Sequence, residues 1–111
     1  VPEEYVVELA NDLNEADILK NGHYDYAFSL TKVEGHWRPL EGADPYDGVI
    51  GQVQTREEMK MEFRIDEEDR EEVQRIIDRI HPYEVPVVNY IQLVYKQMND
   101  EDLFTKRGES A

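Results

Sequence analysis

The chain has 111 residues, 40% of them hydrophobic and 34% charged, with a formal net charge of −14. This length suits one domain with a modest core, and the absence of cysteine excludes disulfides, thiolate zinc sites and a cysteine nucleophile. No apolar run approaches the ~20 residues of a membrane span, and scattered Lys and Arg residues argue against nucleic-acid binding. We therefore expect a cytoplasmic protein that binds neither membranes nor nucleic acid.

The first predicted element is a helix over residues 1–16. Pro2 suits the first helical turn, where its missing N–H is not needed, and the acidic residues after it lie near the positive end of the helix dipole. Apolar residues recur at helical spacing: Val6, Leu9, Ala10 and Leu13. This stripe predicts that one face of the helix packs against the rest of the domain.

Two strands are predicted in the middle of the chain, separated by a long loop. Residues 23–31 alternate between apolar or aromatic and polar side chains, which is typical of a half-buried strand. Residues 34–48 contain three glycines and two prolines, and long loops of this kind often bind a ligand or close an interface. Residues 57–65 alternate again, with four apolar side chains expected on the inner face: Met59, Met61, Phe63 and Ile65.

A second helix is predicted to start after Asp66, a candidate N-cap that is followed by acidic residues. Pro82 ends this helix, because it lacks an N–H and disfavours helical geometry at His81. Residues 87–95 are rich in β-branched and aromatic residues and predict a third strand. Residues 97–111 are polar and are predicted to form a C-terminal tail. The second predicted helix carries its own apolar stripe: Val73, Ile76, Ile77 and Ile80.

The order helix–strand–strand–helix–strand predicts an α+β fold over residues 1–96. Each half has an acidic helix start, an apolar stripe and an aromatic-rich strand. Two such halves form a ferredoxin-like split βαβ sandwich, βαββαβ, from which the leading strand is missing or truncated. We interpret residues 1–2 as the end of that strand. A vacant strand position would leave an unpaired sheet edge, which invites another subunit.

Three motifs carry a resemblance to a known family. They lie at residues 22–25 (GHYD), at residues 35–39 (GHWRP, followed by further Gly and Pro residues) and at residues 81–86 (HPYEVP). In this order and spacing, over residues 2–94, they resemble the small insertion domain of the NGG-interacting-factor-three (Nif-three-like) family, which also occurs as a free-standing protein. The HPYEVP motif is also similar to CutA, the divalent-cation-tolerance proteins, which are related in fold to the PII proteins.

The resemblance implies a non-enzymatic, PII/CutA-like binding or regulatory module that forms homo-oligomers, with a trimer favoured because trimers are the habit of CutA and PII. The sequence departs from the family pattern at Trp37, where phenylalanine is usual, and at Val85, which replaces a second Glu. Large members of the family bind two metal ions on another domain. This chain has three histidines, none in an HxxxD or HExxH pattern, so a metal-dependent hydrolase is the least favoured hypothesis.

The GHWRP loop and the HPYEVP turn are the candidate binding segments. Trp37 and Arg38 can stack on, and pair with, a small-molecule ligand or a neighbouring subunit, although Trp37 can equally pack its loop onto its own domain. Tyr83 has a ring that can pack and a hydroxyl that needs a partner. The predicted ligand or interface residues are Tyr24, His36, Trp37, Arg38, Tyr83 and Glu84.

A divalent-cation site is the alternative hypothesis, and it would serve metal tolerance. His81 and Glu84 carry donor atoms for a cation or for an acid–base pair, and His23 is the third candidate ligand. The spacing is a weak metal signal, because a proline between His81 and Glu84 prevents a shared helical face. We interpret HPYEVP chiefly as a helix stop and strand entry whose side chains also serve an interface. Apart from this cation, no cofactor is predicted.

Overall fold

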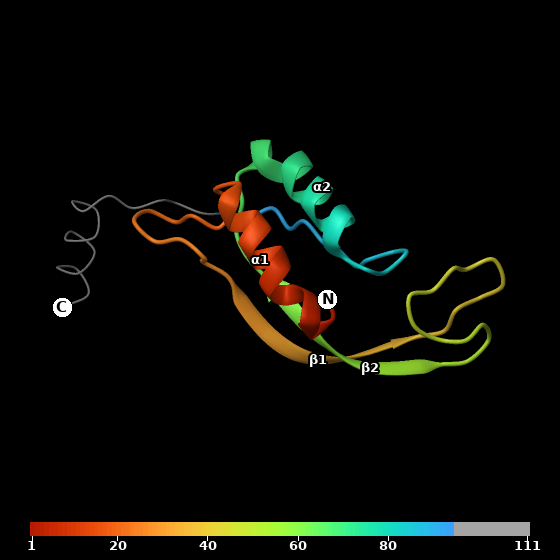
Figure 1. Cartoon of the computed structure of the whole chain (residues 1–111). Coiled ribbons are helices and arrows are strands. Elements are labelled where there is room, and N and C mark those ends of the chain that lie inside the picture. The colour runs from red at the N-terminus through yellow and green to blue at the C-terminus, as the bar shows by residue number, and fades with distance from the viewer. Residues whose placement is uncertain (95–111) are drawn as a thin grey trace.

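The computed structural model describes residues 1–94 of the chain. Two helices lie side by side over a two-stranded antiparallel β-ribbon (Figure 1). This small α+β arrangement is compatible with the predicted ferredoxin-like fold, but only two of the expected strands are formed within the described residues. The predicted tail over residues 97–111 lies outside them. No helix between residues 1 and 94 is long and apolar enough to cross a membrane.

The first helix begins with a 3₁₀ turn, Glu3–Tyr5, and continues as α1, Val6–Glu15. It ends where Asp17 adopts a positive φ of 62°, a left-handed conformation that helical residues do not have. The predicted apolar stripe is confirmed, since its four members are all buried: Val6, Leu9, Ala10 and Leu13.

The second helix also opens with a 3₁₀ turn, Glu67–Asp69, and continues as α2, Arg70–Ile80. Asp66 occupies the N-cap position, as predicted, with an extended backbone, but its side chain makes no capping hydrogen bond. The Asp66 carbonyl instead accepts a bond from the backbone N–H of Asp69 at 2.9 Å. The predicted stop is confirmed: the helix ends at Ile80, and His81 is extended, as expected before a proline.

The two apolar stripes meet between the helices and form the core. Leu13 on α1 and Val73 on α2 are only 0% and 1% exposed. At the surface of the same contact, the Arg79 guanidinium on α2 pairs with the Asp12 carboxylate on α1 at 2.7 Å. The buried core residues are Leu9, Ala10, Leu13, Ile18, Leu19, Val73, Ile76, Ile77 and Ile80. The β-ribbon and the segment after α2 add partly buried side chains: Phe28, Met61, Phe63, Ile65 and Val88.

The first two predicted strands exist, but their boundaries differ from the prediction. β1, Ser29–Trp37, pairs antiparallel with β2, Gln54–Glu62, from Ser29 opposite Glu62 to Trp37 opposite Gln54. Residues 23–28, predicted as strand, lie in a turn, because Tyr26 has a φ of 49° and its N–H bonds the Asn14 side chain at 2.8 Å.

The boundaries of the loop and of β2 shift in the same way. Residues 34–37, predicted as loop, complete β1, so the connection to β2 spans residues 38–53. β2 starts three residues before the predicted range of 57–65 and ends three residues before its end, because the pairing with β1 stops at Glu62. Phe63 and Ile65 follow the strand but still pack against the core, as their spacing predicts.

The third predicted strand is not formed over residues 87–94, and Tyr95 lies outside the described residues. The segment is held beside α2 by side chains: Val88 packs against the core, and the Tyr90 hydroxyl donates to Gln74 Oε1 at 2.8 Å. A strand requires a neighbour for its backbone N–H and C=O groups. Within residues 1–94 no other strand lies beside this segment, so β-type composition alone does not produce a strand here.

The contact between the helices makes a direct stability prediction. Leu13→Ala removes a fully buried side chain and is expected to lower the free energy of unfolding by about 3 kcal/mol. Val7→Ala is the matched control on the same helix, because Val7 is 69% exposed; its expected change is below about 0.5 kcal/mol. Urea unfolding of both variants measures the difference. Equal losses would show that the contact between α1 and α2 is not the core.

Candidate functional site

The loop between β1 and β2 and the HPYEVP turn meet in space, although they are far apart in the sequence. The backbone N–H of Asp44 donates to Glu84 Oε2 at 2.6 Å. The rings of Trp37 and Tyr83 have centroids 6.0 Å apart, and those of Tyr46 and Tyr83 are 5.8 Å apart. The two candidate binding segments of the sequence therefore form one site within a single chain.

Four aromatic rings form the centre of this site, and we call them the aromatic cluster: Tyr5, Trp37, Tyr46 and Tyr83. Tyr5, from the start of the first helix, meets Tyr46 edge-on at 6.3 Å. Trp37, at the end of β1, is oriented by a hydrogen bond from its Nε1 to the Asp47 carbonyl at 3.1 Å. The cluster thus joins the helical layer, the β-ribbon and the loop, and such edge and tilted ring contacts add to the stability of a packed site.

Arg56 on β2 contacts the aromatic cluster and two acidic residues beside it. Its guanidinium carbon lies 5.7 Å from the centre of the Tyr46 ring, in cation–π geometry. The same guanidinium pairs with Glu4 at 2.7 Å and with Asp47 at 3.2 Å. Sequence reasoning missed Arg56, because an arginine beside two glutamates in a strand carries no distinguishing motif.

His81 adjoins Tyr83 at the end of α2. The backbone N–H of Tyr83 donates to His81 Nδ1 at 3.2 Å, and the two ring centroids lie 4.9 Å apart. Burial is the main cause that lowers the pKa of His81 to about 4, and the positive charge of the Val1 amino group lowers it further. The negative charge of Glu58 acts in the opposite direction. The imidazole is therefore neutral at pH 7, and because Nδ1 accepts a bond, its proton is placed on Nε2.

The Tyr83 hydroxyl is buried and has no hydrogen-bond partner within the described residues. Burial, and next the nearby Glu58 carboxylate, raise the pKa of Tyr83, so the group stays protonated. Glu58 is close enough to act on this pKa, but no bond of acceptable geometry joins the two groups. Glu58 crosses the ribbon over Gly35, where any side chain would collide with its carboxylate. The glycine thus leaves room for an acid beside Tyr83.

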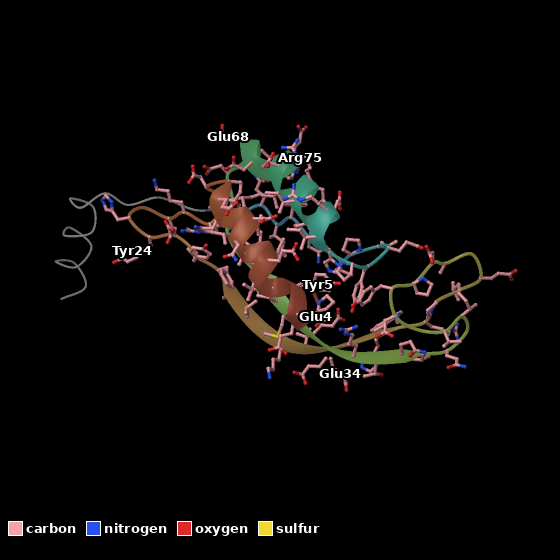
Figure 2. All side chains as sticks on the ribbon, in the orientation of Figure 1. Glu4, Tyr5, Tyr24, Glu34, Glu68 and Arg75 are labelled. Carbon is pink, nitrogen blue, oxygen red and sulfur yellow. The ribbon has the colours of Figure 1, made fainter. Side chains whose placement is uncertain are left out.

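The structure brings together only part of the predicted ligand or interface set. Trp37, Tyr83 and Glu84 meet in the site, while Arg38 is exposed on the loop beyond β1. His36 lies on the outer side of the ribbon, where its Nε2 is 3.0 Å from Glu34 Oε2. Figure 2 shows Glu34 pointing away from the helices.

Tyr24 lies at the other end of the molecule from the aromatic cluster. It is 79% exposed, in the turn that precedes β1, and Figure 2 shows it far from Glu4 and Tyr5. His23 sits in the same turn and is therefore far from His81. Among residues 1–94 no group of three or more His, Asp or Glu side chains is placed to hold a metal ion. One chain therefore does not assemble the predicted set of His23, His81 and Glu84.

Comparison with known proteins gives two kinds of match. Residues 49–101 match the family model of the CutA1 divalent ion tolerance protein. The chain is also 33% identical over 93 residues to a "GTP cyclohydrolase 1 type 2 homolog" of Staphylococcus epidermidis strain RP62A, a match that covers 84% of this chain and 25% of the relative. A protein of the same name from Staphylococcus aureus strain Mu50 is 30% identical over 93 residues, with the same coverage of both chains.

The matches to the two long relatives cover only part of each relative. The chain spans about a quarter of the length of the curated proteins that it resembles. No solved structure matches it. The match to CutA1 includes β2, α2 and the HPYEVP turn, which supply Arg56, His81 and Tyr83 to the site.

The neutral state of His81 predicts a pH dependence of stability. The unfolded chain protonates histidine near pH 6.5, whereas the folded protein does so only near pH 4. Stability is therefore fully present above pH 6.5 and decreases as the pH falls from about 6.5 to about 4. His81→Gln is expected to flatten this part of the profile, which urea unfolding at a series of pH values measures.

His23→Gln is the matched control, because it removes an exposed histidine far from the site. Its profile is expected to run parallel to that of the unsubstituted protein. A His81→Gln profile as steep as that of the control would contradict the burial of a neutral His81.

Proposed function

We propose that the chain is a CutA1-like, PII-related binding module without enzymatic activity, equivalent to a free-standing form of the small domain of the Nif-three-like family. The match to CutA1 over residues 49–101 and the similarity to two long relatives support this proposal. The module acts in the cytoplasm as a homo-oligomer, with a trimer favoured. The molar mass from light scattering checks the assembly, and a stable monomer at micromolar concentration would contradict it.

The proposed binding site is the aromatic cluster, and the observation that carries it is the unpaired Tyr83 hydroxyl. Buried polar groups are nearly always hydrogen-bonded, and leaving one without a partner costs about 1–3 kcal/mol. The Tyr83 hydroxyl lies among aromatic rings and beside Arg56, which pairs with carboxylates. A small molecule with a planar part and a hydrogen-bond acceptor would stack on the rings and satisfy this hydroxyl.

The partial coverage of the long relatives limits what their names say about this chain. Those proteins are named as homologues of GTP cyclohydrolase 1 type 2, and this chain corresponds to about a quarter of them. Within residues 1–94 no cluster of metal-binding side chains is present. We therefore assign binding rather than hydrolysis to this chain, and GTP incubated with the protein is expected to remain intact.

The first test of the site is a conservative substitution. Tyr83→Phe removes the unpaired hydroxyl and keeps the ring, so in the absence of ligand it is expected to raise the free energy of unfolding by about 1 kcal/mol. Tyr24→Phe is the matched control, because Tyr24 is exposed and remote. A loss of stability in Tyr83→Phe would show that the hydroxyl already has a partner.

The single tryptophan of the chain, Trp37, reports on binding in the same experiment. ATP and GTP serve as probes, since each has a planar base and anionic groups. The expected result is a saturable change in Trp37 fluorescence with at least one of them. Tyr83→Phe should then weaken binding about fivefold, the equivalent of one hydrogen bond of about 1 kcal/mol. Unchanged affinity in Tyr83→Phe would remove Tyr83 from the site.

A divalent cation is the second candidate ligand, and the state of His81 favours it. A neutral imidazole is the form that binds metal ions. A cation at His81 would have to displace the Tyr83 N–H from Nδ1 or the proton from Nε2. Glu84 lies in the same turn, with its Oε2 bonded to the Asp44 N–H. Because one chain does not present three ligands together, a neighbouring subunit would have to complete the site. The description of the matching family as a divalent ion tolerance protein agrees with this hypothesis.

Calorimetric titration with Cu²⁺, Zn²⁺ and Ni²⁺ tests the cation hypothesis. Binding is expected to disappear in His81→Ala and to persist in His23→Ala, which removes the histidine far from the site. Binding should also weaken as the pH falls, because protons compete for the imidazole. Equal heats for both variants would eliminate His81 as a ligand.

A further inference from the structure

The Tyr83 hydroxyl is enclosed in this structure, although a ligand at the aromatic cluster would have to reach it. Its oxygen is buried, and within residues 1–94 it has no hydrogen-bond partner. The rings of Trp37 and Tyr46 lie against the Tyr83 ring, with centroids 6.0 and 5.8 Å from it. A ligand can therefore bond to this oxygen only after one of the neighbouring groups has moved.

Of the other rings in the aromatic cluster, only that of Tyr46 is carried by a segment outside the helices and strands. Tyr5 belongs to the 3₁₀ turn that opens the first helix, and Trp37 ends β1 opposite Gln54. Tyr46 lies in the loop between β1 and β2, which extends beyond the ribbon (Figure 1). Movement of this loop is therefore the way to uncover Tyr83 with the least change elsewhere in the fold.

Residues 42–48 of this loop form a unit that we call the lid. The lid begins at Gly42 and ends at Gly48, whose φ angles are 97° and 117°. Glycine adopts positive and negative φ at similar cost, so the chain can rotate at both ends of the lid. None of the lid residues is buried. Opening the lid therefore exposes little apolar surface, which is typical of segments that open locally.

The lid is tied to the rest of the domain at two points. At the first, the Asp44 N–H donates to Glu84 Oε2 on the HPYEVP turn at 2.6 Å. At the second, the Asp47 carbonyl accepts a bond from Trp37 Nε1 at 3.1 Å, and the Asp47 carboxylate pairs with Arg56 at 3.2 Å. The aromatic residue of the lid lies between these two points in the sequence, so both ties keep its ring in the cluster.

The bond to Glu84 is the tie that is easier to release. Glu84 is exposed, so its carboxylate can exchange the Asp44 N–H for water, for a cation or for a donor group of a ligand. The Arg56 side chain is only 23% exposed and also pairs with Glu4, so the second tie is less accessible. A bond from a backbone N–H to a carboxylate is stronger than a neutral one. Its loss is therefore expected to change the population of the open lid.

We propose that residues 42–48 are a lid over Tyr83 and that Glu84 is the latch that holds this lid closed. When the bond between Glu84 and Asp44 breaks, the lid turns at its two glycines and takes the Tyr46 ring away from Tyr83. A ligand then reaches the buried hydroxyl, and reclosure returns the Tyr46 ring to the cluster. This control of access rests on the proposed function, whereas the lid itself opens without a ligand.

Hydrogen exchange of the full chain, followed by NMR without ligand, tests the latch. Glu84→Ala is expected to accelerate exchange of the Trp37 indole N–H about tenfold, because this group bonds to the far end of the lid and exchanges when the lid opens. Glu84→Gln keeps an acceptor oxygen and is expected to give a smaller acceleration.

Two controls separate opening of the lid from other effects. The Gly51 N–H bonds to the Pro39 carbonyl at 2.7 Å, outside the lid, and its exchange should not change. Glu41→Ala is the matched variant, because it removes an exposed acid beside the lid and leaves the latch in place. Exchange of the Trp37 indole N–H is expected to stay unchanged in this variant.

The effect on binding is measured with ATP and GTP as probes, by stopped-flow fluorescence of Trp37. Association with Glu84→Ala is expected to be about tenfold faster than with the unsubstituted protein, because the open state that admits the probe is more populated. Absence of binding to both proteins would contradict the proposed function, and the exchange experiment, which uses no ligand, would still decide whether the lid exists.

Three results would overturn the proposal. The first is acceleration confined to the Asp44 N–H in Glu84→Ala, which would show that the bond is local and latches nothing. The second is an equal acceleration of the Trp37 indole N–H in Glu41→Ala, which would assign the effect to charge. The third is faster exchange in Glu84→Ala without faster association of a probe that binds, which would show that the lid does not control access.

Discussion

The apolar contact between α1 and α2 is the interaction on which the rest of this structure depends. Leu13 and Val73 are buried there almost completely, and they are surrounded by the other members of the two stripes. The antiparallel packing of the helices brings the start of the first helix and the end of the second to one end of the domain (Figure 1). Tyr5 and the HPYEVP turn therefore lie together over the β-ribbon. Burial of this apolar surface also opposes the repulsion within a chain of net charge −14.

The site at that end is built from contacts between distant parts of the sequence. Arg56 on β2 joins Glu4 before α1 to Asp47 in the loop, and the Tyr83 ring contacts those of Trp37 and Tyr46 in tilted geometry. Many contacts hold the site together, yet it contains the Tyr83 hydroxyl, which has no partner among residues 1–94, and the neutral imidazole of His81. Groups of this kind are frequent where proteins bind ligands, because a folded core alone gains nothing from them.

The sheet, by contrast, contains only two of the three strands that the sequence predicts, as far as the described residues go. Within residues 1–94 only β1 and β2 pair, and the segment over residues 87–94 is held by side-chain contacts of Val88 and Tyr90. The core is formed because the two helices bury their apolar stripes against each other. The helices therefore supply most of the buried core, and the ribbon adds partly buried side chains to it.

The sequence by itself determined the two helices, their apolar stripes and the stop before Pro82, because periodicity and proline act within a few residues of the chain. It also singled out the loop with Trp37 and the turn with Tyr83 as candidate binding segments, and the fold brings these two segments together. Strand boundaries and the missing third strand were not predictable, since a strand depends on a neighbour that can lie anywhere in the sequence. The roles of Arg56 and of Gly35 beneath Glu58 were likewise decided only by tertiary structure, because they arise from contacts across the fold and leave no local pattern.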